Sequence, residues 1–116
     1  MSENENVVLT KSYNFAVRIV KMYQHLSSKK EEFVLSKQIL RSGTSIGANI
    51  EEAIGGISKA DFRAKMSIAY KEARETDYWL RLLKDTDYLK VESFNSTRND
   101  LNEILRLLYS IVKSCT

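Results

Sequence analysis

The chain has few of the residues that form reactive or covalent sites. It contains one histidine and one cysteine, His25 and Cys115, among 116 residues. A single cysteine allows no internal disulfide, and no Cys/His cluster has the spacing of a metal site. A bundle that binds two metals carries Glu-x-x-His motifs, whereas Met22 stands three positions before His25. We therefore expect no metal, no cofactor and no catalytic residue, and we expect the protein not to be an enzyme.

Long hydrophobic runs are also missing. No apolar run approaches the roughly 20 residues that cross a bilayer, and the first eight residues, MSENENVV, are polar and acidic rather than a secretory signal. These features predict a cytoplasmic protein with no membrane partner. Hydrophobic residues make up 43% and charged residues 28% of the chain, a composition typical of a globular domain rather than a disordered chain.

Apolar side chains recur at helical spacing through most of the sequence, and no strand pattern appears. We expect a flexible tail at residues 1–9, followed by a single domain at residues 10–116 that begins with a helix capped by Thr10. Four helices are predicted near residues 10–27, 31–54, 58–85 and 92–115. Their short connections predict an all-α fold, an antiparallel up-down-up-down four-helix bundle.

Two of the four glycines, Gly43 and Gly47, lie one turn apart inside the second predicted helix. A glycine within a helix costs about 1 kcal/mol relative to alanine, so the pair requires an explanation. A phosphate-binding loop would need a Gly-Lys-Ser/Thr ending after a strand, and neither is present. We expect the glycines to let another helix approach closely.

A polar stripe follows the same helix. Its members Arg41, Ser45 and Asn49 lie about one turn apart. We expect a buried polar ladder to Glu72 or Glu75, because buried polar groups need partners. A binding site is the alternative.

Two separated motifs resemble one protein family. The first is Gln38-x-Leu40-Arg41-Ser42-x-x-Ser45-Ile46-x-x-Asn49-Ile50-x-Glu52, and the second covers residues 69–80. Both are similar to motifs of the bacterial four-helix-bundle proteins named after the 23S rRNA intervening sequence. The resemblance extends over about residues 10–115. It implies the bundle fold. Related accessory proteins of diversity-generating retroelements form pentameric rings that engage nucleic acid and a reverse transcriptase, so the resemblance also implies a pentamer.

Basic residues form two stripes. Residues 10–30 carry Lys and Arg but no acid, which suits an anionic partner or balances acids elsewhere in the molecule. The third predicted helix alternates arginine with tyrosine, a pattern found both in nucleic-acid sites and in subunit interfaces. The candidate nucleic-acid-binding residues are Lys11, Arg18, Lys21, Arg63, Arg74 and Arg81.

The third predicted helix also has more apolar surface than one bundle buries. Exposed apolar patches usually mark an interface. The candidate interface residues are Ile68, Tyr70, Tyr78, Trp79 and Leu82. We therefore predict a homo-oligomer that binds RNA or DNA through its basic stripes. A scaffold or adaptor that binds only other proteins is the alternative.

Overall fold

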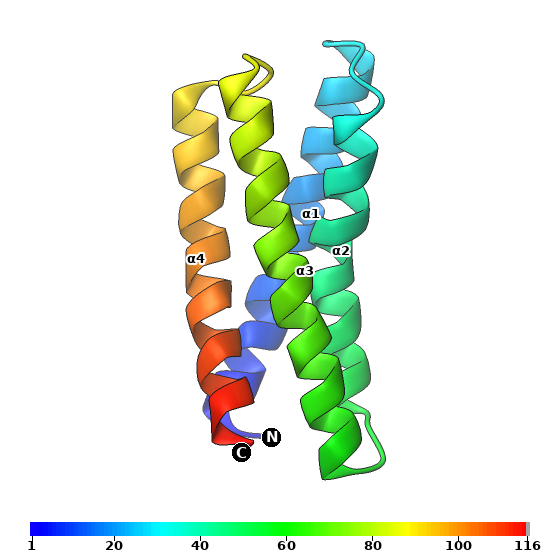
Figure 1. Ribbon diagram of the computed structural model, residues 1–116, viewed down its shortest axis with the longest axis vertical. Coiled ribbons are helices and arrows are strands. Elements are labelled where there is room, and N and C mark those ends of the chain that lie inside the picture. Colours follow the sequence, from blue (N-terminus) through cyan, green and yellow to red (C-terminus); the bar gives the residue numbers. More distant parts are fainter. Residues whose placement is uncertain (116) are drawn as a thin grey trace.

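The protein consists of four α-helices. The structure is a computed structural model that describes residues 1–115, with α1 at Glu3–Ser28, α2 at Leu35–Ile54, α3 at Lys59–Asp85 and α4 at Val91–Ser114 (Figure 1). None of the described residues lies in a β-strand. This confirms the all-α class. No helix in the described part of the chain is long and apolar enough to span a bilayer.

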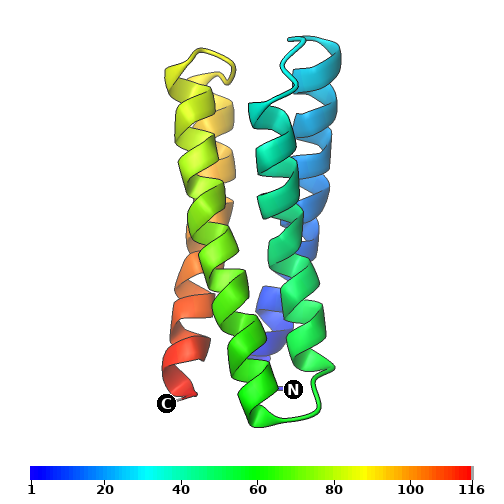
Figure 2. The same cartoon turned by 45° about the vertical axis from the view of Figure 1, so that its right-hand side comes forward.

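Neighbouring helices run in opposite directions along one long axis, and the two chain ends lie at the same end of the molecule (Figures 1 and 2). Helix α2 packs between α1 and α3, and α4 packs against α3 and α1. The molecule measures 43 × 21 × 19 Å. Every surface feature therefore lies on a face between two neighbouring helices or at one of the two ends.

The core follows the spacing of three and four residues seen in the sequence. Each helix buries one apolar stripe along the shared axis. The largest fully buried side chains are Phe15, Ile19, Leu26, Ile39, Ile46, Ile50, Met66, Leu80, Leu83, Leu101, Ile104 and Leu108. No side-chain N or O atom buried among the described residues lacks a hydrogen-bond partner.

Helix α1 begins earlier than the sequence pattern indicated. Ser2 caps it, with the Ser2 hydroxyl accepting a hydrogen bond of 3.1 Å from the Glu5 backbone N–H. Val8 is fully buried, and the Thr10 hydroxyl donates within the helix to the Asn6 carbonyl. Residues 3–9 are therefore helical, so the predicted tail at residues 1–9 and the predicted cap at Thr10 are wrong. Ser2 and Glu5 have the three-residue spacing of a capping box, which would have indicated this start.

Helix α2 begins at Leu35 rather than near residue 31 because Glu32 caps it from outside. The Glu32 carboxylate accepts backbone N–H bonds from Val34 at 3.1 Å, Leu35 at 3.0 Å and Ser36 at 2.7 Å. Burial alone raises the pKa of this carboxyl group, but the hydrogen bonds from Ser36, Leu35 and Val34 outweigh burial and hold the pKa below its usual value.

Both glycines of α2 face α1. A Cβ atom on Gly43 would lie 2.9 Å from both Cγ atoms of Ile19, whereas a Cβ on Gly47 would lie 3.4 Å from the Ser12 carbonyl oxygen and hydroxyl. The two sites therefore differ. Gly43 leaves no room for a side chain, and Gly47 leaves just enough for a methyl group.

We predict that Gly43→Ala and Gly47→Ala change stability in opposite directions. Alanine gains about 1 kcal/mol of helix propensity at either site. At Gly43 the methyl group meets Ile19, whose β-branched side chain has little freedom to turn away, and overpacking costs about 1–3 kcal/mol. Urea unfolding should show Gly43→Ala less stable than Gly47→Ala by about 1–3 kcal/mol. Equal effects would contradict the close contact at Gly43.

Candidate nucleic-acid interface

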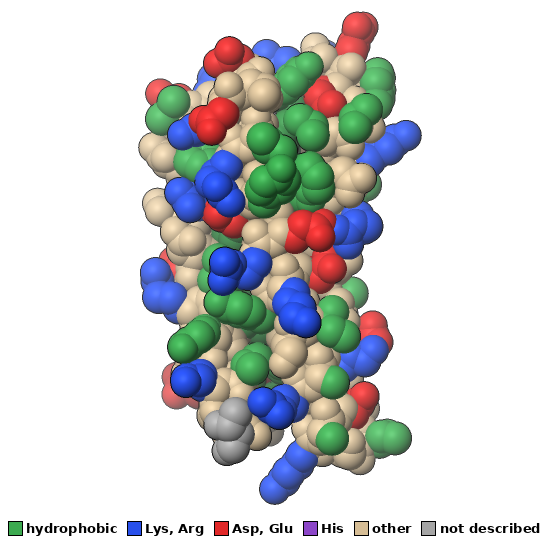
Figure 3. Space-filling model, in the orientation of Figure 1, with side chains coloured by type: hydrophobic (Ala, Val, Ile, Leu, Met, Phe, Trp, Pro, Cys, Tyr) green, Lys and Arg blue, Asp and Glu red, His purple; other side chains and the backbone are tan. Residues whose placement is uncertain are grey.

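Cationic and aromatic side chains of α3 and α4 share one face of the molecule. On α3 they follow one another at spacings of about one or two turns, and α4 adds a second row beside them. Figure 3 shows Lys and Arg side chains along these two helices. We name the set the α3–α4 face, and it comprises Arg63, Tyr70, Arg74, Arg81, Arg98, Arg106, Tyr109 and Lys113.

Asp77 ties the two rows together. The Arg98 Nε donates to one carboxylate oxygen of Asp77 at 2.8 Å, and Arg98 Nη2 donates to the other at 3.3 Å. Arg81 Nε donates to that second oxygen at 3.1 Å. The Asp77 side chain is 16% exposed, whereas those of Arg81 and Arg98 are 51% and 41% exposed. Asp77 thus fixes both guanidinium groups from below, and their remaining N–H donors stay accessible.

Two tyrosines provide flat surface between the cations. The rings of Tyr70 and Tyr109 lie 6.1 Å apart, centre to centre. Lys113 Nζ lies 5.9 Å from the Tyr109 ring centre, and Arg74 Nη1 approaches the Tyr70 hydroxyl at 3.5 Å. Tyr109 is 53% exposed. Aromatic faces beside cations are suited to stacking of bases along a bound strand.

The predicted basic stripe on α1 lies on a different side and is partly neutralised. Lys11 pairs with Glu103 at 2.7 Å, and Arg18 pairs with Asp100 at 2.9 Å. The hydrogen bond to Glu103 raises the pKa of Lys11, and the same bond lowers the pKa of Glu103. Lys21 is exposed and forms no ion pair with any residue that the structure describes. Lys11 and Arg18 therefore balance acids of α4, the alternative left open by the sequence.

The predicted polar ladder is held by Arg41 alone. Arg41 Nη1 donates to Glu72 at 2.9 Å, and Arg41 Nη2 donates to Glu75. Ser45 and Asn49 instead donate to carbonyl oxygens of their own helix. The Arg41 side chain is 48% exposed. The prediction of a buried ladder through Ser45 and Asn49 is thus wrong.

The candidate interface residues differ in exposure. Ile68 is 42% and Tyr78 is 48% exposed. Trp79 is half-buried, packs against the core and donates its indole N–H to Glu75 at 3.1 Å. Leu82 is also half-buried. A single copy therefore covers part of Trp79 and Leu82, and Ile68 and Tyr78 carry most of the exposed apolar surface.

The contribution of α4 to this face was not predicted from the sequence. Arg98, Arg106 and Lys113 recur at spacings of eight and seven residues. The buried Leu101 and Leu108 have the same spacing of seven residues but lie on another side of the helix. This regular spacing places them on a single solvent-facing side. The spacing was visible in the sequence, but only the packing of α4 against α3 places these three side chains beside the arginines of α3.

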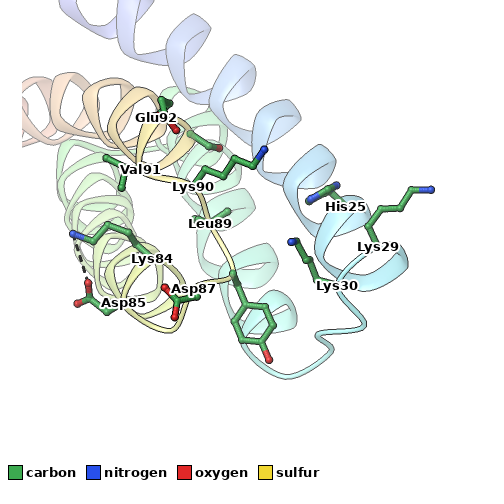
Figure 4. A pocket seen from close by; sticks show the side chains of 12 residues that line it. His25, Lys29, Lys30, Lys84, Asp85, Asp87, Leu89, Lys90, Val91 and Glu92 are labelled. Carbon is green, nitrogen blue, oxygen red and sulfur yellow. Dashed lines mark ion pairs between the residues drawn. The ribbon is translucent and has the colours of Figure 1, made fainter.

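A hollow of about 1090 Å³ lies at one end of the molecule, between the end of α1 and the connection from α3 to α4 (Figure 4). Lysines and acids alternate around it, and Lys84 pairs with Asp85 at 3.5 Å. Across residues 1–115, no three His, Cys, Asp or Glu side chains gather as metal ligands. The hollow therefore offers neither a metal site nor a surface of one charge.

Comparison with known proteins finds one protein family and several solved structures that match. The sequence pattern of the 23S rRNA-intervening sequence protein family matches residues 4–110. The chain is also similar to a protein with unknown function from the S23 ribosomal protein family of Bacteroides thetaiotaomicron VPI-5482, solved by crystallography at 1.70 Å resolution. The two chains are 57% identical with a TM-score of 0.93, and the match covers 95% of this chain and 98% of the other. No curated protein matches.

We predict that Asp77→Asn costs about 1–2 kcal/mol of unfolding free energy, because hydrogen bonds from two guanidinium groups lose their charged acceptor. Arg98→Gln should then cost less in the Asp77→Asn background than in the wild type. Asp100→Asn, which removes the more exposed partner of Arg18, should cost less than Asp77→Asn. Urea unfolding of the four variants measures this, and equal costs at Asp77 and Asp100 would contradict it.

Proposed function

The chain belongs to the 23S rRNA-intervening sequence protein family, and from that premise we propose that it is a non-catalytic, homo-oligomeric protein of the cytoplasm that binds RNA or DNA. Its antiparallel up-down-up-down four-helix bundle presents the α3–α4 face as the binding surface. The observation that carries this proposal is the sign of the charge. Five arginines and one lysine from two helices lie on this face, and Asp77, which pairs with two of the arginines, is half-buried beneath them.

The dimensions of the face suit a strand of nucleic acid. Arg63 and Arg81 are eighteen residues apart on one continuous helix, which corresponds to about 27 Å at 1.5 Å per residue. One strand of a duplex advances about 3.4 Å per phosphate, so this length faces about eight phosphates. Arginine forks bind phosphate oxygens, while Tyr70 and Tyr109 provide stacking surface. These contacts read no base sequence, which favours a ligand selected by shape or strandedness.

Self-association would make this modest surface effective. One chain carries a net charge of only +3, whereas linked copies bind with the effective concentration of a multivalent ligand. We propose that the exposed apolar residues of α3, Ile68 and Tyr78 with the half-buried Trp79 and Leu82, join the copies. A five-membered ring is the arrangement implied by the resemblance to the retroelement accessory proteins. A protein scaffold without a nucleic-acid ligand is the alternative, and the same apolar residues favour it.

Salt dependence tests the binding proposal. We expect fluorescence anisotropy to show binding to a labelled single-stranded DNA and to a structured RNA hairpin at low salt. Each phosphate contact on a single strand contributes about −0.7 to the slope of log K against log salt concentration. The double variant Arg63→Gln/Arg74→Gln should therefore reduce that slope by about 1.4.

The control for this pair is Lys29→Gln/Lys30→Gln, which removes the same charge from exposed positions just after α1, outside the face. It should leave the slope close to the wild-type value. Equal losses in both double variants would remove the α3–α4 face as the binding site. The absence of any complex at low salt would leave the scaffold alternative.

The oligomer has its own test. Ile68→Arg changes an exposed side chain, so it should lower the mass measured by light scattering while circular dichroism shows unchanged helicity. Trp79→Glu should act in the same direction. Val91→Arg, at an exposed site at the start of α4, is the control and should keep the wild-type mass. An unchanged mass in Ile68→Arg and Trp79→Glu would exclude this part of α3 from any interface.

A further inference from the structure

A second surface, between α1 and α2, carries no charge over about two turns of each helix. On α1 it exposes Tyr13 at 65%, Val17 at 40% and Val20 at 37%. On α2 the adjoining residues are Leu40, Thr44 and Ala48. We name these six residues the α1–α2 strip. Charged residues make up 28% of this chain, so an uncharged exposed surface of this length is unusual, and contiguous apolar surface usually has a partner.

The two ends of the strip carry opposite charges that have no ion-pair partner among residues 1–115. Lys37 and Glu51 are both exposed, and neither forms an ion pair or a side-chain hydrogen bond. They lie fourteen residues apart on α2, about 21 Å along its axis and almost in line on the same side. Thr44 is midway between them in sequence. The strip is thus positive at one end, neutral in the middle and negative at the other end.

This charge pattern is complementary to itself. A two-fold axis through the middle of the strip, perpendicular to the helices, brings each positive end against the negative end of the other copy. The neutral middle of one copy then covers the neutral middle of the other. We infer that the α1–α2 strip is a two-fold interface with a second copy of this chain, in which Lys37 of each copy pairs with Glu51 of its partner.

The strip is not flat. A hollow of about 250 Å³ lies off its centre, lined by Tyr13, Thr44, Ala48 and Glu51 among others. Gly47 also lines it, and the missing side chain there leaves space. The close contacts of Gly43 with Ile19 and of Gly47 with Ser12 define which levels of α1 and α2 adjoin.

This contact is separate from the proposed interface on α3. The α1–α2 strip lies on the side of α2 that faces α1, whereas Ile68 and Trp79 lie towards the other side of α2. The two interfaces can therefore form together, and removing one leaves the other intact. In the Ile68→Arg background we expect a mass twice the 13.4 kDa of one chain.

The test uses charge reversal in the Ile68→Arg background with analytical ultracentrifugation. Lys37→Glu alone places two acids together at each contact, and Glu51→Lys alone places two bases together. Each should halve the mass. Combining both changes in one chain restores opposite charges and should restore the dimer. An equimolar mixture of the two single variants should also restore it, because each mixed pair then matches at both contacts.

Two further variants guard against a general loss of structure. Val17→Arg places a cation on the apolar part of the strip and should halve the mass. Val7→Arg changes another exposed valine of α1 that lies outside the strip, and it should leave the mass unchanged. A monomeric Ile68→Arg protein with normal helicity would mean that something other than a second copy covers the strip, and would overturn the inference. Failure of the mixed variants to associate would overturn it as well.

Discussion

The close approach of α1 and α2 at Gly43 is the contact on which the rest of the arrangement depends. The Ile19 side chain lies directly against the backbone at Gly43, so α2 contributes no side chain of its own to this contact. Helix α2 is thereby held in one rotation about its axis. Its opposite side must then meet α3, where the Thr76 hydroxyl donates to the Ser42 hydroxyl at 2.9 Å in the core. One small residue therefore determines which residues of α2 face α1, which face α3 and which face solvent.

The distribution of carboxylates decides which cations are available to a ligand. Asp100 and Glu103 lie on the side of α4 next to α1, where they neutralise Arg18 and Lys11. On the other side of α4, Asp77 is the carboxylate that contacts the arginines, and it binds two of them at once. A stripe of basic residues in a sequence is therefore weak evidence for a binding surface. Basic residues on one side of α4 are neutralised by ion pairs within the molecule, whereas those on the other side remain accessible to a ligand.

Local patterns in the sequence predicted the four helices, the buried seam and the approach of a helix to Gly43 and Gly47. These features depend on residues three to seven positions apart, which share a helix face whatever the tertiary structure is. The cap of α2 was missed because Glu32 acts through its side chain from a non-helical position. The Ser2 cap was missed because a short polar start resembles a loose end until Val8 is seen to be buried.

The candidate site depends on ion pairs between residues that are far apart in sequence. Lys11 and Glu103 are ninety-two positions apart and Arg98 and Asp77 twenty-one, and nothing local in the sequence specifies either pair. For the same reason the sequence showed the arginines of α3 but not the row on α4 that lies beside them.

Both surfaces proposed for self-association border α2, and this has a consequence for the binding face. Contacts through the α1–α2 strip and through Ile68 and Trp79 leave most of the side of α3 that adjoins α4 uncovered, and Tyr78, 5.9 Å from the Arg81 guanidinium, lies at the border. Each added copy thus contributes another α3–α4 face and leaves most of those already present uncovered. Because phosphate contacts on linked copies add to one binding event, assembly raises affinity while each chain keeps its modest net charge. This gain in affinity depends on keeping most of the apolar contacts away from the cationic face. If both used one surface, a second copy and the ligand would compete for it.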